Sequence, residues 1–236
     1  MKRSEVNRII RDGEVFVRQH GFFLPPFASW TAQDWENQGP QAREIAQHAL
    51  GWDVTDFGLG EYAKKGVLLF TIRNGSLENL RAMKGKTYCE KILICGVDQL
   101  VLHHYHKSKT EDIINRGGGD LEIILHWADE NGRFQDRDVS VSCDGVERTV
   151  AAGGKVVLTP GQSITLEPLQ YHQFRALGKP VLVGEVSTVN DDANDNFFYE
   201  LVGRFPQIEE DEAPYRLLMT DYARYYKHGA APKAGY

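Results

Sequence analysis

Cysteine is scarce in this chain, and its spacing excludes two common uses of the residue. Cys89, Cys95 and Cys143 are the three cysteines among 236 residues, and no two of them form a Cys-x-x-Cys pair. An odd number of cysteines without close pairs suits neither a disulfide framework nor a thiolate zinc site. We therefore expect reduced thiols in the core of a cytoplasmic protein.

Long apolar runs and blocks of basic residues are missing as well. No segment approaches the roughly 20 apolar residues of a membrane-spanning helix, and the polar N-terminus lacks the apolar core of a secretory signal. The formal net charge is −6, and lysine and arginine do not cluster. We therefore expect neither a membrane nor a nucleic acid as a partner, and a cytoplasmic location.

The first part of the chain has a helical pattern. Its apolar residues form a broken helical stripe at Val6, Ile9, Ile10, Val15 and Phe16. Thr31 with Asp34 is close to a capping box, and Pro40 and Gly51 suit the first turn and the C-terminal stop of a further helix. We expect residues 1–65 to form a helical segment that packs on a sheet.

From about residue 66 the pattern changes to many short strands. The segments with strand character are 67–72, 91–95, 99–106, 121–127, 139–142, 146–150, 155–158, 163–166, 172–176 and 181–189. Asp144-Gly145 is a strong hairpin signal, and Gly117-Gly118-Gly119 is expected to connect two strands. The pattern predicts a mainly β jelly roll or small barrel over residues 66–228, with a helical patch at 215–226 and a flexible tail at 229–236.

A cluster of potential metal ligands lies at the end of the strand predicted at residues 99–106. His104 and His106 are two residues apart, so strand alternation turns both imidazoles to one face. Glu111 can reach the same point from the following turn, and His172, in a later strand-and-turn pattern, could close the set. Two or three histidines with one carboxylate suit Mn, Fe, Co, Ni or Zn and argue against Ca or Mg alone.

These residues stand in two patterns that resemble the cupin motifs. His104-x-His106-x4-Glu111-x6-Gly118 matches the first motif, and the segment 160–172, which ends in a histidine, is similar to the second. Two features depart from the cupin pattern: Gly96 lies two residues early, and the usual glycine after Pro168 is missing. The turn before His172 is therefore expected to differ from the usual one.

Longer strings resemble a narrower group, the D-lyxose isomerase family of cupins. These strings are 111–119, 184–187, 189–192 and 203–212, and the similarity runs through most of the chain. With the helical patterns, the resemblance implies a cupin jelly-roll β-barrel with an N-terminal helical segment and a short C-terminal helix. It also implies that four side chains converge on one divalent metal: His104, His106, Glu111 and His172.

The same resemblance implies an activity, a metal preference and an assembly. The activity is aldose–ketose isomerisation of a small sugar, D-lyxose to D-xylulose, with D-mannose to D-fructose as a related reaction. The implied metal is Mn²⁺, although other divalent metals such as Co²⁺ also suit the ligands. The implied assembly is a homodimer.

Two candidate catalytic residues emerge from their positions. Glu185 lies on the apolar strand face of Val181 and Val183, where a carboxylate either pairs with another group or lines a cavity. We interpret it as the general base that moves a proton between C2 and C1 through a cis-enediol; a salt-bridged structural acid is the alternative. Lys109 lies between two ligands and could donate a proton or bind a sugar hydroxyl; a solvated turn lysine is the alternative.

Further charged residues are candidates for binding sugar hydroxyls. Lys91 shares a strand face with Leu93 and could reach the barrel interior. Asp191, Asp192 and Arg204 lie near predicted loop turns, where charged side chains are usually solvated.

Other functions also fit the predicted ligands. An Fe²⁺-dependent cupin oxygenase could use the same donor set, and a non-catalytic sugar-binding cupin is a third hypothesis. The longer strings favour the isomerase. The sequence leaves open whether hydrogen moves as a proton or as a hydride.

Overall fold

The computed structural model describes residues 1–228, and the flexible tail predicted at 229–236 lies outside the described residues. The helices are α1 (Arg3–Gln19), η1 (Pro26–Ser29), α2 (Ala32–Glu36), η2 (Pro40–Ala42), α3 (Arg43–Gln47), α4 (Leu77–Ala82), η3 (Met219–Asp221) and α5 (Tyr222–Tyr225). The strands are β1 (Gly51–Thr55), β2 (Val67–Asn74), β3 (Tyr88–Cys95), β4 (Val101–Tyr105), β5 (Glu111–Ala128), β6 (Phe134–Gln135), β7 (Val139–Cys143), β8 (Val146–Val150), β9 (Lys155–Leu158), β10 (Ser163–Leu166), β11 (Gln170–Thr188) and β12 (Phe197–Phe198).

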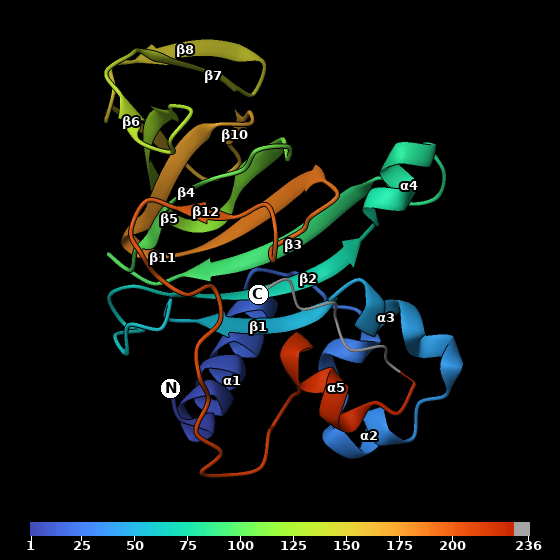
Figure 1. The fold of residues 1–236 in the computed structure, drawn as a ribbon. Helices are drawn as coiled ribbons and strands as arrows, with labels where there is room; N and C mark the ends of the chain where they lie inside the picture. Colours follow the sequence, from blue (N-terminus) through green and yellow to red (C-terminus); the bar gives the residue numbers. More distant parts are fainter. Residues whose placement is uncertain (229–236) are drawn as a thin grey trace.

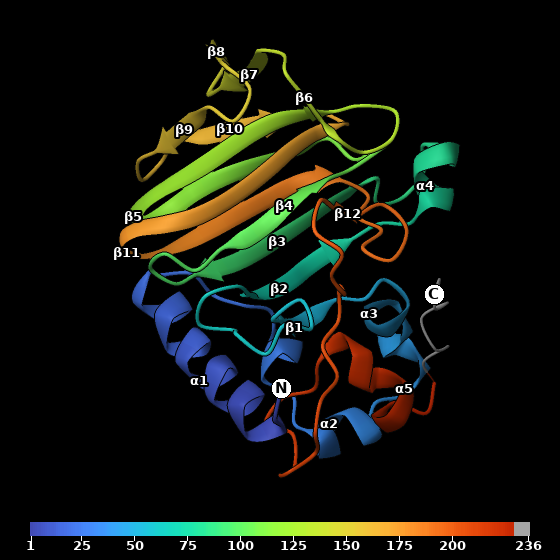
Figure 2. The ribbon, with the colours of Figure 1, turned by 60° about the vertical axis from the view of Figure 1, so that its left-hand side comes forward.

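Within residues 1–228, the 12 strands hydrogen bond into one sheet that rolls over itself into a jelly-roll barrel (Figures 1 and 2). The order along its main path is β1-β2-β3-β11-β5-β10-β7-β8, and β4, β6, β9 and β12 pair beside this path. The predicted mainly β fold is thus confirmed.

Two long strands close the barrel because each belongs to both of its walls. The first half of β5 pairs with the second half of β11, and this half of β11 also pairs with β3. The second half of β5 pairs with the first half of β11, and this half of β11 also pairs with β4. The pairing register shifts where Gly118 lies opposite Val181. A Cβ on Gly118 would lie 2.0 Å from the Pro180 carbonyl oxygen, so glycine permits the close passage of the two strands.

This arrangement corrects the predicted strand boundaries. The segments predicted at 172–176 and 181–189 are two halves of the continuous strand β11. Gly117-Gly118-Gly119 is a bend inside β5 and does not connect two separate strands. The predicted Asp144-Gly145 hairpin is confirmed, since it joins β7 to β8 with both residues at positive φ.

Helices cover the outer face of one wall. Alternation along β2 turns Val67 and Leu69 into the barrel core and Leu68 and Phe70 outward. The outward residues pack against α1, which lies beneath β1 and β2 in Figure 1. Gly13 allows this close packing, because a Cβ there would lie 2.2 Å from Leu68 Cδ2. Among the described helices, none is long and apolar enough to cross a membrane.

The predicted helices of the N-terminal and C-terminal segments are confirmed in part and corrected in two places. The capping box of Thr31 and Asp34 is present at the start of α2. Gly51, however, opens the strand β1 instead of ending a helix, so its prediction as a C-terminal stop is wrong and the N-terminal segment contains a strand. The predicted C-terminal helical patch narrows to η3 and the short helix α5.

Arg3 ties the first helix to the C-terminal segment. Its side chain is 1% exposed, and its guanidinium donates to the carboxylates of Glu210, at 2.7 and 2.8 Å, and Asp221, at 2.9 and 3.0 Å. The pairing joins segments separated by more than two hundred residues of sequence.

We expect Arg3→Ala to lower the free energy of unfolding by about 3 kcal/mol, because two carboxylates then share a partly buried space without a counter-charge. Arg8→Ala is the matched control on the same helix, since Arg8 and its partner Asp12 are 64% and 70% exposed. Its effect should stay below about 0.5 kcal/mol. Urea unfolding measures the free energy of unfolding of both variants. Equal losses of stability would contradict this account of the Arg3 ion pairs.

Candidate active site

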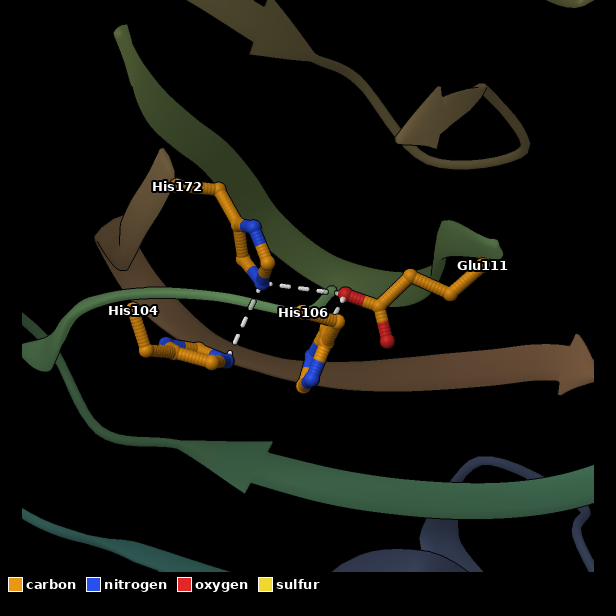
Figure 3. Close-up of side chains that lie close together, drawn as sticks. All are labelled: His104, His106, Glu111 and His172. Atoms are coloured by element: carbon orange, nitrogen blue, oxygen red, sulfur yellow. Dashed lines mark hydrogen bonds and ion pairs between the residues drawn. The ribbon is translucent and has the colours of Figure 1, made fainter. Parts of the chain in front are cut away.

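The four side chains predicted to bind a metal converge inside the barrel (Figure 3). His104 lies on β4, His106 directly follows that strand, and His172 lies on the first half of β11. Glu111 is the first residue of β5, so it belongs to a strand and not to the preceding turn. One ligand atom of each side chain lies within 4.8 Å of the ligand atoms of the other three.

Main-chain carbonyls orient all three imidazoles. The Nδ1–H groups of His104 and His172 donate to the carbonyls of Leu102, at 2.8 Å, and Gln170, at 3.1 Å. His106 Nδ1–H donates in the same way to the Asp195 carbonyl. Because a carbonyl can only accept, each Nδ1 carries a proton, which leaves the Nε2 lone pairs for a metal.

The arrangement of these lone pairs fits a bound cation. His104 Nε2 and His172 Nε2 are 3.0 Å apart, and His172 Nε2 is 3.0 Å from Glu111 Oε1. Burial and the neighbouring imidazoles hold the pKa of His104 well below its usual value, so this ring is neutral at pH 7. Among residues 1–228, the buried His106 Nε2 and Glu111 Oε1 have no hydrogen-bond partner. Acceptors crowded in this way repel one another unless a cation lies between them.

The turn before His172 holds a residue other than glycine in a conformation that favours glycine. Leu169 occupies this position with φ of 69°, in the left-handed region that glycine adopts without strain. Its N–H donates to the His106 carbonyl at 2.7 Å, and its carbonyl accepts from the Ala128 N–H at 2.8 Å. These two bonds hold the turn and link it to His106 and to the end of β5.

A row of charged side chains, alternating in sign, extends from the proposed metal ligand Glu111 to β1. We call it the charge row. The distances along it are Glu111–Lys109 2.6 Å, Lys109–Glu185 2.9 Å, Glu185–Lys91 3.3 Å, Lys91–Asp192 3.5 Å, Asp192–Arg204 3.2 Å and Arg204–Asp53 2.6 Å. Lys91 and Glu185 are direct cross-strand partners on β3 and β11, so strand register creates the middle of the row.

Neighbours of opposite sign favour the charged forms of Lys109 and Asp192. Burial disfavours the ammonium of Lys109, but Glu111 and Glu185 raise its pKa above the usual value. Burial likewise opposes ionisation of Asp192, yet Lys91 and Arg204 hold its pKa below the usual range. The stabilisation comes from neighbours of opposite charge in a poorly solvated space.

All members of the charge row except Asp53 line one cavity, together with His104, His106 and His172. Its apolar walls include Leu69, Leu93 and Phe174. Small ligands typically bind in spaces of this kind, where apolar walls surround a few convergent polar groups.

Five of the candidate catalytic and binding residues line this cavity: Lys91, Lys109, Glu185, Asp192 and Arg204. Within residues 1–228, Asp191 does not belong to the cavity lining; its carboxylate instead accepts hydrogen bonds from Asn194. Its neighbour Asp192 lies in the cavity wall.

Sequence reasoning missed three residues that complete the site. Asp53 lies on the unpredicted strand β1 and fixes Arg204, and burial raises the pKa of its carboxyl against the effect of that guanidinium. Asn190 Oδ1 accepts from Lys91 Nζ at 2.7 Å and from Lys109 Nζ at 3.3 Å. Asn196 lines the cavity, and its Oδ1 is buried without a hydrogen-bond partner in the described chain.

Comparison with known proteins agrees with the resemblance read from the sequence. The family model described as D-lyxose isomerase matches residues 1–222. A D-lyxose/D-mannose isomerase of Serratia proteamaculans is 46% identical over 229 residues, which cover 95% of this chain and 99% of that protein. One from Escherichia coli O157:H7 is 42% identical over 95% of this chain and 100% of its own length.

Solved structures share the fold at low identity. A mutant of the L-ribose isomerase of Acinetobacter sp. DL28, in complex with L-ribose, has a TM-score of 0.59 and 14% identity over 89% of this chain and 98% of its own. The Cellulomonas parahominis L-ribose isomerase gives 0.58 and 16% with the same coverage. At this identity the likeness shows a common architecture.

We expect the chelated chain to bind Mn²⁺ again, and His104→Ala to weaken this binding by more than about 100-fold, because loss of a direct ligand should exceed the usual loss of an outer-shell partner. The same result is expected for His106→Ala, Glu111→Ala and His172→Ala. His126→Ala is the control, since that ring stacks on Phe134 outside the ligand cluster. Calorimetric titration measures each affinity. Wild-type affinity in a variant would show that the substituted residue is not a metal ligand.

Proposed function

Because this chain belongs to the D-lyxose isomerase family and is a sugar isomerase, we propose that its cavity interconverts D-lyxose with D-xylulose. D-Mannose and D-fructose form the related pair of substrates. The proposal includes one divalent metal, Mn²⁺ in preference to others such as Co²⁺, held by His104, His106, Glu111 and His172.

One observation carries this proposal most directly. Three imidazoles with satisfied Nδ1–H groups and one carboxylate converge beside the Lys109–Glu185 pair in a single cavity. Metal ligands and proton-transfer groups are therefore adjacent, as isomerisation requires. A bound divalent metal would act as a Lewis acid that polarises the carbonyl and adjacent hydroxyl of the open-chain sugar.

We assign the proton transfer to Glu185. Its carboxylate takes the proton from C2 of the aldose, which gives a cis-enediol, and returns it to C1 to form the ketose. Lys109 Nζ and Lys91 Nζ contact its Oε1 at 2.9 and 3.3 Å and hold this oxygen in place. Lys109 also moves the accompanying proton between the two sugar oxygens. It is suited to this role because its Nζ contacts the carboxylates of both Glu111 and Glu185.

Lys91 and Arg204 are proposed to bind sugar hydroxyls. Both line the cavity, and among residues 1–228 the buried Arg204 Nη1 has no hydrogen-bond partner. Asp191 was predicted for the same role, but the geometry favours Asp192, which lines the cavity and contacts both cations. Asn196 adds an unpaired acceptor in the same wall.

Three further proposals rest on sequence patterns and family resemblance. The chain acts as a homodimer, and it acts in the cytoplasm. Its barrel and C-terminal extension, residues 66–228, form one functional unit with the N-terminal segment 1–65.

A screen of free pentoses and hexoses, with Mn²⁺ restored after chelation and oxygen excluded, tests the activity. We expect conversion of D-lyxose and D-mannose and loss of a C2 deuterium to solvent. Complete retention of the deuterium would support a hydride shift instead. Turnover that requires O₂ would support the Fe²⁺-dependent oxygenase, and binding without conversion would support a sugar-binding protein.

We expect Glu185→Gln to retain Mn²⁺ and to lose at least about 100-fold in kcat, the usual contribution of a general base. Glu122→Gln is the matched control, because Glu122 is also a buried strand glutamate in two ion pairs, with Lys155 and Arg175, but lies outside the cavity lining. Steady-state kinetics with metal analysis compares the two. Near-normal turnover of Glu185→Gln would show that another group is the base.

A further inference from the structure

One wall of the cavity is a segment that also contacts the turn carrying metal ligands. This wall segment, residues 190–198, contributes Asp192, Asn196 and Phe198 to the cavity lining. Its end forms β12, which pairs with β4 so that Phe198 stands opposite His104. The wall segment therefore lies beside both the ligands and the space for a substrate.

Asp195 makes the most extensive contacts between this segment and the turn 106–109. Its carboxylate accepts from the N–H groups of Lys107, Ser108 and Lys109, at 2.6, 3.2 and 3.0 Å, and from Ser108 Oγ at 2.7 Å. One carboxylate thus fixes three successive residues between two metal ligands. Bonds from N–H groups to a carboxylate are stronger than bonds to a neutral acceptor.

The main chain of the same residue orients a ligand directly. The Asp195 carbonyl accepts the Nδ1–H of His106, which fixes the tautomer and the direction of Nε2. The side chain therefore positions the turn, and the carbonyl positions the ring. Because both functions belong to one residue of the wall segment, displacement of this segment would also displace His106 and Lys109.

We propose that Asp195 is a positioning residue that couples the wall segment to the metal ligands. The inference rests on the proposed metal-dependent function. Asp195 contacts neither metal nor sugar in this scheme; it acts through His106, which binds the metal, and through Lys109, which contacts Glu111 and Glu185.

Asp195→Ala tests the proposal because it removes the carboxylate but keeps the carbonyl. A loss of metal affinity then reports movement of that carbonyl and of the turn. We expect Mn²⁺ affinity without sugar to fall about 10- to 100-fold, the usual effect of an outer-shell partner. Asp195→Asn keeps one acceptor oxygen, so its affinity should lie between those of Asp195→Ala and the wild type.

Asp211→Ala is the matched control. Asp211 also joins distant segments through a backbone N–H and a serine hydroxyl, those of Ser4, at 2.9 and 2.7 Å. It lies outside the cavity lining, and its loss should leave Mn²⁺ affinity unchanged. The measurements are chelator competition for Mn²⁺ and the melting temperature of the chelated chains.

The outcomes separate positioning from general stability. A purely structural role would lower the melting temperature of chelated Asp195→Ala while its folded form kept wild-type affinity, and this would overturn the proposal. If Asp195→Ala does not fold, Asp195→Asn decides by the same criterion. A wild-type chain that binds no Mn²⁺ would overturn the proposed function as well, whereas normal wild-type binding with unchanged variants overturns this inference alone.

Discussion

Electrostatic compensation inside an apolar barrel is the constraint on which the site depends. Seven charged groups stand in the charge row between Glu111 and Asp53, each beside a group of opposite sign. An isolated charge in such a space would cost several kcal/mol or lose its charge, so no member can be understood alone. Formal charges in the row sum to −1 before any cation binds among the ligands, since four carboxylates face three cations. A divalent metal beside Glu111 therefore enters a field that favours it.

The barrel supplies this arrangement through strand register and bending. β5 and β11 pass from one wall to the other, so β11 presents His172 in its first half and Glu185 in its second. A straight strand would place these two side chains far apart. The crossing of the two strands, where Gly118 of β5 lies opposite Val181 of β11, lets β11 place the proposed metal ligand and the proposed base in the same cavity.

Local patterns predicted the parts of the site that depend on local geometry. His104 and His106 could be predicted because strand alternation fixes their common face. Lys91 and Glu185 could be predicted because each shares a strand face with apolar neighbours. The sequence does not rank Asp191 against Asp192, because loop residues have no period that tells which side chain turns inward.

Long-range contacts explain the remaining failures. Asp53 lies on β1, a strand too short to produce a clear pattern. Its role depends on pairing with Arg204, which lies 151 positions later in the chain. The Gly117–Gly119 bend resembles a turn in sequence, because only the opposite strand β11 makes it part of a continuous ladder. Main-chain carbonyls orient the histidines, and because every residue has one, the sequence does not indicate which of them do so.

The contacts of Arg3 have a consequence for how the chain acquires its structure during synthesis. The ribosome releases the N-terminus first, yet the carboxylates that bind Arg3 lie 207 and 218 residues later. Arg204 likewise reaches Asp53 only after most of the chain has been made. Neither the Arg3 ion pairs nor the end of the charge row can form until the segment 204–221 has been synthesised. Until then the side chains of Arg3 and Asp53 must stay solvated, because burial without their partners would be costly, so these N-terminal segments reach their final packing late.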